Sequence, residues 1–143
     1  MCIVAVCDPR AVISTYLVTT VTAALTAMRV KTGTRIYSPR LPIATALQQA
    51  LTFRVTATET NQYIPEMVDC WVEFHCWGAS TADATQVSRL LYDALQGIEN
   101  AVVGANIIYN AEHNSTQDPI IDPDSVQGEE WWFALSLYTI QVR

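Results

Sequence analysis

Pro65–Gly97, PEMVDCWVEFHCWGASTADATQVSRLLYDALQG, carries the clearest secondary-structure signal in this chain. Its first part alternates between two sets of side chains with the two-residue period of a β-strand, and Gly78 ends that pattern. Ser80 and Asp83 then form a near match to a capping box, in which a serine side chain satisfies a free amide of the first helical turn. The stretch therefore predicts a strand, a sharp break and an amphipathic helix that ends near Gly97.

The predicted strand has two different faces. One face is apolar throughout and is typical of a side that packs on a core: Val68, Cys70, Val72, Phe74 and Cys76. The other face mixes charged groups with two tryptophans: Asp69, Trp71, Glu73, His75 and Trp77. A monomeric domain seldom leaves such a face open to water, so we expect it to contact another copy or another protein.

The composition favours one domain that partners cover in part. The length of 143 residues predicts a single domain over 1–143, with an N-terminal helical segment at 1–33 and a core of sheet plus helix at 34–143. Only 15% of the residues are charged and 50% are hydrophobic, which is a low charge content for a free-standing domain. With a net charge of -6 and eight basic residues, the chain lacks the basic surface that holds a protein on nucleic acid. The loose basic cluster is more typical of a solvated linker than of a phosphate contact: Arg29, Lys31, Arg35 and Arg40.

The four cysteines predict neither a disulfide nor a metal site. Cys70 and Cys76 share one strand face and lie roughly 20 Å apart at about 3.3 Å per residue, which is beyond disulfide reach. Cys2 and Cys7 do not have a zinc-ligand spacing. We expect reduced cysteines in a cytosolic compartment, and no cofactor.

The uncharged run at 11–28 raises the question of a membrane span. Asp8 and Pro9 predict a helix start, because aspartate is a good N-cap and proline fits the first helical position. Several threonines interrupt the run, and about 18 residues is the lower limit for crossing a bilayer. We expect a helix docked on the rest of the protein and no membrane partner. A membrane attachment through 11–28 is the alternative.

The remaining patterns predict a mainly antiparallel sheet. A short strand is expected at 35–37, and the strand Ala50–Thr60 is expected to form a hairpin with the strand after Pro65. Next come a continuous strand at 101–112, a polar loop at 113–128, and a last strand at 130–142. Because the last strand is apolar on both faces, we expect both of its faces to be covered. The predicted fold is α+β: a two-layer structure with a mainly antiparallel β-sheet and two main helices packed on it.

The sequence carries no convincing catalytic motif. Glu73 and His75 share a face, whereas Cys76 points to the opposite face and cannot act with His75 as a nucleophile and base. A structural or interface ion pair is the favoured interpretation over a catalytic dyad, so we predict that the protein is not an enzyme.

The acidic residues of the predicted polar loop give no clear metal site. Asp118, Asp122 and Asp124 carry the oxygen ligands that calcium prefers, but the glycine and the closing glutamate of a calcium loop are missing. A solvated acidic loop is favoured. Long loops in small domains often bind something, so Asp118 and Asp122 are also candidates for a partner contact.

Over residues 35 to 143, the chain resembles the tail terminator, or tail completion, proteins of long-tailed bacteriophages and their relatives at the head-to-tail neck. The resemblance rests on order and spacing. The matching features are Arg35–Tyr37 with Leu41-Pro42, the strand Ala50–Ala57, Cys76-Trp77-Gly78, the helix Ser80–Gly97 with Ala84, Leu91 and Ala94-Leu95, the Asp118-Pro119 loop, and the strand from Trp131-Trp132 to Val142.

The resemblance implies a structural virion protein, assembled in the host bacterial cytoplasm, that forms a ring, which in this family is a hexamer. Such a ring terminates the tail tube and joins it to the head connector or stopper protein, and DNA passes through its lumen without specific binding. Head-to-tail ring closure needs two different patches on each subunit. The candidate contact residues are Trp71, Glu73, His75, Trp77, Asp118, Asp122, Trp131 and Trp132.

Other functions stay open on the sequence. A small α+β ligand-binding or regulatory module is the main alternative, and it predicts a concave apolar pocket with convergent polar groups. An enzyme that uses Glu73 and His75 is a further alternative. Each of the tryptophans also fits an ordinary core position.

Overall fold

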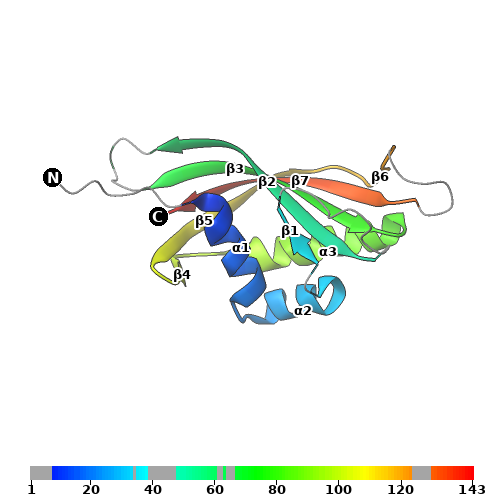
Figure 1. Ribbon diagram of the computed structural model, residues 1–143, viewed down its shortest axis with the longest axis horizontal. Helices are drawn as coiled ribbons and strands as arrows, with labels where there is room; N and C mark the ends of the chain where they lie inside the picture. The colour runs from blue at the N-terminus through cyan, green and yellow to red at the C-terminus, as the bar shows by residue number, and fades with distance from the viewer. Residues whose placement is uncertain (1–7, 34, 39–47, 61–62, 64–66, 124–129) are drawn as a thin grey trace.

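The computed structural model describes residues 8–33, 35–38, 48–60, 63, 67–123 and 130–143. These residues form an α+β fold in which the helices cover one face of a curled sheet (Figure 1). The predicted fold class is therefore confirmed. In chain order the elements are α1 (Pro9–Thr19), α2 (Ala23–Thr32), β1 (Ile36–Tyr37), β2 (Ala50–Thr60), β3 (Val68–Gly78), α3 (Thr81–Leu95), β4 (Ala101–Val103), β5 (Asn106–Thr116), β6 (Ile120–Ile121) and β7 (Trp132–Val142).

The sheet has the strand order β1-β2-β3-β7-β5-β4, so the last strand lies between β3 and β5. Only β1 pairs in parallel, and every other pair is antiparallel. The predicted hairpin of β2 and β3 is present. The short β6 pairs with β7 beyond the end of β5, so the segment from β5 to β6 follows one edge of β7 over most of its length.

The core lies between the sheet and the helices, and the apolar face of β3 is at its centre. All five side chains predicted for that face are buried: Val68, Cys70, Val72, Phe74 and Cys76. Phe74 lies between two other buried rings, with its centroid 5.8 Å from that of Phe53 on β2 and 5.3 Å from that of Tyr138 on β7. Alternation along β3 therefore identified the core side correctly.

The N-terminal segment forms two helices where the sequence predicted one. Asp8 caps α1 through a bond from the Arg10 amide, as expected, but α1 ends at Thr19 and the chain turns by 90° into α2. Thr22 starts the second helix by accepting a hydrogen bond from the Leu25 amide at 3.1 Å. The reason for the break is that threonine side chains compete for backbone bonds and cap helices better than they continue them.

The corner between α1 and α2 is held by one guanidinium. Arg29 donates to the carbonyls of Leu17 and Thr20, at 2.9 and 2.5 Å. These carbonyls belong to the end of α1, where intrahelical donors are missing. Tyr16 also donates from its hydroxyl to the Ala94 carbonyl at 3.4 Å, which connects α1 to α3. No helix in the described residues is by itself long and apolar enough to cross a membrane, and α1 and α2 meet that criterion only as a bent pair.

The helix after β3 is close to its prediction. The Ser80 side chain accepts a bond from the Asp83 amide at 3.3 Å, and the helix ends at Leu95, two residues before Gly97 with its φ of 75°. Gly78 allows β3 and α3 to meet closely. A Cβ atom at Gly78 would lie 2.6 Å from the Cβ of Asp83 and 2.7 Å from the amide nitrogen of Ala84.

Two predictions for the segment 101–128 are wrong. The expected continuous strand at 101–112 is a hairpin, because Gly104 adopts a φ of 59° and turns the chain between β4 and β5. The expected loop at 113–128 is paired at 113–116, where β5 continues to Thr116, and at 120–121, where β6 follows. Polar side chains there suggested a loop, but strand pairing with β7 satisfies the backbone whatever the side chains are.

The prediction that both faces of β7 are covered is also wrong within one chain. One face is buried under the helices: Ala134, Ser136, Tyr138, Ile140 and Val142. The opposite face is half-exposed along its whole length, because no described helix lies over it (Figure 1).

Some predictions fall on residues outside the described ranges. These concern Cys2, Cys7, the prolines at 39 and 42, and Asp124. The two described cysteines, Cys70 and Cys76, are buried in the core. Burial raises the pKa of the Cys76 thiol to about 12, so it is unreactive at neutral pH.

Candidate interface on the outer sheet face

We call the side of the sheet that faces away from the helices the outer face (Figure 1). On β3 and β7 it carries half-exposed or exposed side chains that are apolar or aromatic, with the exception of Glu73: Trp71, Glu73, His75, Trp77, Phe133, Leu135 and Leu137. Strand register puts Trp77 beside Phe133 and Glu73 beside Leu137. The face expected from β3 alone is therefore continued by β7, and the two strands form one surface.

One end of the outer face is an aromatic cluster centred on Trp77. Its ring stacks on His75 with centroids 5.9 Å apart, contacts Phe133 at 5.1 Å, and meets Trp131 edge-on at 5.8 Å. His75 and Phe133 are themselves 5.0 Å apart. The indole nitrogen of Trp77 donates to Thr52 Oγ1 at 2.9 Å, which satisfies both polar groups beneath the cluster.

A short charged series lies beside the cluster. Arg54 Nη2 lies 3.3 Å from Glu73 Oε2, and His75 Nε2 lies 3.8 Å from Glu73 Oε1. Glu73 and His75 therefore lie close together on one face, as the strand pattern predicted. Burial lowers the pKa of His75, with a smaller effect of Arg54 in the same direction, while Glu73 and Asp122 act against it. The imidazole is therefore neutral at neutral pH, and it serves chiefly as an aromatic surface.

The other candidate residues have different positions. Trp71 is 38% exposed on the outer face, farther along β3. Asp122 lies at the edge of the cluster, where its amide donates to the Trp131 carbonyl at 2.7 Å. Asp118 is exposed between β5 and β6. Trp132 lies on the helix side and packs against the core, so it is separated from the other tryptophans.

Sequence reasoning missed the part of the surface that β7 contributes. Phe133, Leu135 and Leu137 alternate along the last strand and therefore share one face, but both faces of that strand were expected to be covered. The missing information was that β7 pairs directly with β3, since two strands separated by a helix and a hairpin give no local signal for pairing. Once the register is known, alternation on both strands identifies the whole face.

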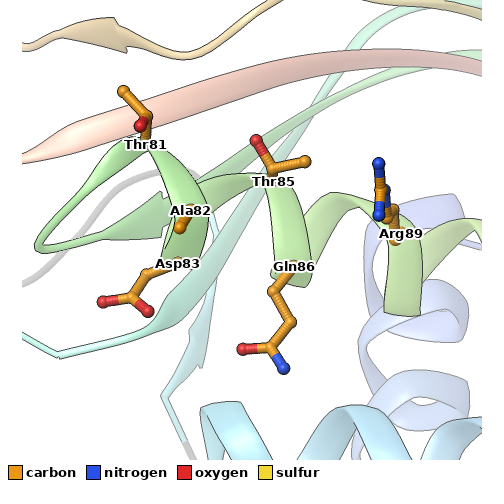
Figure 2. A pocket seen from close by; sticks show the side chains of 6 residues that line it. All are labelled: Thr81, Ala82, Asp83, Thr85, Gln86 and Arg89. Atoms are coloured by element: carbon orange, nitrogen blue, oxygen red, sulfur yellow. The ribbon is translucent and has the colours of Figure 1, made fainter.

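Two hollows of the described surface lie beside α3. The first lies along α3, with a volume of about 530 Å³, and Figure 2 shows its side chains pointing in different directions along the helix. Two residues of this hollow hold Gln49, which precedes β2. Gln49 Nε2 donates to the Gln86 side chain at 3.0 Å and to the Asp83 backbone carbonyl at 3.2 Å. A second groove of about 400 Å³ lies between α3 and β5, near Tyr92 and His113.

No group of three or more potential metal ligands occurs in the part of the chain that the structure describes. Asp118 and Asp122 lie on that part, whereas Asp124 does not.

Comparison with known proteins gives a structural match only. No protein-family model matches the chain, and no curated protein matches it. A solved structure, "Virion of native gene transfer agent (GTA) particle", contains a chain that superposes with a TM-score of 0.58. The match covers 94% of this chain and 97% of that chain, at 15% sequence identity. The two chains share a fold. Because the likeness spans nearly all of both, the common fold includes the helices as well as the sheet.

Proposed function

We propose that this protein is a structural subunit of a phage-like virion, located at the neck or tail and without enzymatic activity. The likeness to a virion chain over 94% of this chain and 97% of that one carries the proposal. The outer face supports it, because an aromatic surface with few charges is what a subunit buries against its neighbours. The Glu73–His75 pair fits a contact surface better than a catalytic site, since Cys76 lies on the opposite face of β3.

The more specific proposal is a tail terminator ring. In this role the subunits close into a hexamer that stops growth of the tail tube and joins it to the head connector. The outer face then serves as a contact surface for the tube or connector protein. A net charge of -6 suits a lumen through which DNA passes, because a wall that attracted phosphates would retard the DNA.

The native mass of the purified protein, with electron microscopy of the same sample, tests the ring. We expect closed rings with a central hole and a mass near six times 15.9 kDa. Addition of tail tubes purified from the same virion should place a ring at one end of each tube. A monomer at all concentrations that also leaves the tubes uncapped would contradict the proposal.

Variants separate the outer face from the rest of the surface. Leu137→Ser removes an apolar side chain from the centre of the outer face, and Val30→Ser is the matched control, since Val30 is 74% exposed on α2. We expect Leu137→Ser to weaken capping of tail tubes at least tenfold and Val30→Ser to leave it unchanged. Equal effects of the two variants on capping would show that the outer face is not the contact surface.

A further inference from the structure

Two strand edges of the sheet are unpaired in the described part of the chain. On β2, β1 pairs with Leu51 and Thr52 only, which leaves 54–60 without a neighbour on that side. On β5, β4 pairs with 106–108 only, which leaves 110–116. Proteins usually protect long free edges with charged side chains, proline, bulges or very short strands. These two segments, RVTATET and NAEHNST, contain no lysine or proline, although each has charged side chains and a register irregularity.

The two edges lie at the same height in the sheet. Tracing paired residues from β2 across β3 and β7 to β5 places Val55 level with His113 and Thr58 level with Ala111. The three successive antiparallel pairings also make β2 and β5 run in opposite directions. When copies are related by rotation about an axis along the strands, the β2 edge of one copy therefore meets the β5 edge of the next in antiparallel orientation. Antiparallel pairing is the more stable kind.

The hydrogen-bonding groups of the β2 edge point outward at defined residues. Leu51 donates to the Arg35 carbonyl at 2.9 Å, so its backbone groups face away from β3. In an antiparallel pair these directions alternate along the strand. The extra residue between Val55 and Ala57 shifts this alternation by one. As a result, the backbone N–H and C=O groups of Thr58 point away from β3, and we call such a residue an outward residue.

The same reasoning applies to the β5 edge. Ile107 and Arg143 exchange two backbone bonds of 2.8 Å, which fixes where β5 faces β7. The alternation and the irregularity between Ile108 and Asn110 then make Ala111 an outward residue. The side chains of Thr58 and Ala111 both lie on the helix side, since each is aligned with a buried residue on the neighbouring strand. The two edges thus match in bond direction as well as in face.

One pair of opposite charges faces across the two edges. The Arg54 side chain is 61% exposed on the β2 edge, and Glu112 is exposed on the β5 edge. Both point to the outer face, because Arg54 is aligned with Glu73 and Glu112 with Thr139. The register places them as diagonal neighbours, within about 8 Å of each other across such a junction, and it places Glu59 on the other diagonal of Glu112, so the junction rests on backbone pairing and not on charge.

We infer that copies of this chain join edge to edge, with residues 54–60 of β2 pairing antiparallel with residues 110–116 of β5 in the next copy. The contact is heterologous, so it repeats around a ring and leaves no free edge when the ring closes. This inference rests on the proposed ring and names the contact that closes it. It also gives a partner to the two free edges on opposite sides of one sheet.

A designed cysteine pair tests the register. Thr58→Cys and Ala111→Cys in the same chain place two thiols opposite each other across the junction, at about 5.5 Å between Cα atoms, which suits a disulfide. Oxidation of assembled protein should give a covalent ladder up to the ring size on a denaturing gel. The two single variants and the unmodified chain control for Cys2 and Cys7. Rings that form but give no ladder beyond these controls would overturn the inference.

Proline substitutions test the backbone bonds. Thr58→Pro and Ala111→Pro each remove an N–H that points to the free edge and spare the bonds to β3 and β7. We expect the variants to stay folded and to lose rings at concentrations where the unmodified chain is fully assembled. Thr58→Val and Ala111→Val keep the N–H and should assemble. If circular dichroism shows that a proline variant does not fold, the disulfide ladder of the double cysteine variant is the deciding test of the edge-to-edge contact.

The two proposals fail in different ways. If the unmodified chain forms no ring, alone or on tail tubes, the proposed function fails. If the rings form and both folded proline variants still assemble, the function stands and the edge-to-edge contact is wrong.

Discussion

The two faces of β3 and β7 belong to the same backbone but differ in what covers them. On the inner face, Phe74 and Tyr138 are buried under α3 and the other helices. On the outer face, Trp71, Trp77 and Leu137 are apolar as well, yet no described helix lies over them. The inner face is stabilised within one chain, whereas a comparable burial of the outer face would require a partner to cover it. Apolar residues on both faces of a strand therefore predict that both faces are contact surfaces, but they do not say whether the contact is made within the chain or with another chain.

Removing a ring from the inner face should have the largest effect. Phe74→Ala takes away a fully buried side chain that contacts Phe53 and Tyr138, so it leaves a cavity. We expect the free energy of unfolding to fall by about 3–5 kcal/mol in urea titrations. Phe74→Leu keeps most of the volume and should cost clearly less. A loss below about 1 kcal/mol for the alanine variant would mean that the inner face is not packed as described.

The junction between β3 and α3 should tolerate change poorly, though less severely. Gly78→Ala puts a Cβ within 3 Å of the Asp83 side chain and the Ala84 amide nitrogen. Because a backbone atom cannot move aside as a flexible side chain does, we expect a loss of about 1–3 kcal/mol in the same titration. An unchanged midpoint would show that the helix has room to shift.

A substitution on the outer face should cost the folded chain less. Trp71→Ala removes a large side chain from a half-open position, where water fills the space instead of leaving a cavity. We expect a loss of about 1 kcal/mol in the free energy of unfolding of the isolated chain. A loss of unfolding free energy as large as that of Phe74→Ala would show that the outer face is packed within the chain as firmly as the inner face.

The smallest expected effect is a pH dependence from the outer face. Because the pKa of His75 is lowered in the folded state, the unfolded chain binds a proton more readily below about pH 6.5. Stability should therefore be constant above that value and should decline as the pH falls toward the folded pKa. His75→Gln should flatten this part of the profile in thermal unfolding measured from pH 5 to 8. A profile that the substitution leaves unchanged would assign the dependence to other groups.

Local patterns predicted the central elements well. The inner face of β3, the hairpin with β2 and the cap of α3 at Ser80 depend on residues close in the chain, and each is confirmed. Prediction failed where polarity was read as a loop, as at 113–116, or where a glycine turn was overlooked, as at Gly104. Threonine-rich sequence likewise concealed the corner between α1 and α2. In these cases the pairing partner or a single φ angle determines the structure more than the composition does.

The candidate surface was only half visible in the sequence. Trp71, Glu73, His75 and Trp77 were identified because alternation along one strand is a local property. The part of the surface that β7 contributes could be recognised only from the pairing of β7 with β3. The strand register likewise places Trp132 on the helix side, away from this surface. The structure likewise places Asp122 near His75, a neighbour that nothing in the local pattern indicated.

The sequence by itself determined which side chains share a strand face, where α3 begins, and that the net charge of the chain is negative. These follow from the period of the backbone, from capping bonds between near neighbours, and from a simple sum of charges. Only the tertiary structure decided that β7 lies between β3 and β5, that one face of the sheet is left without helices, and that the edges of β2 and β5 lie level. The physical reason is that strand pairing uses backbone groups common to every residue, so partner and register are selected by packing of the whole chain.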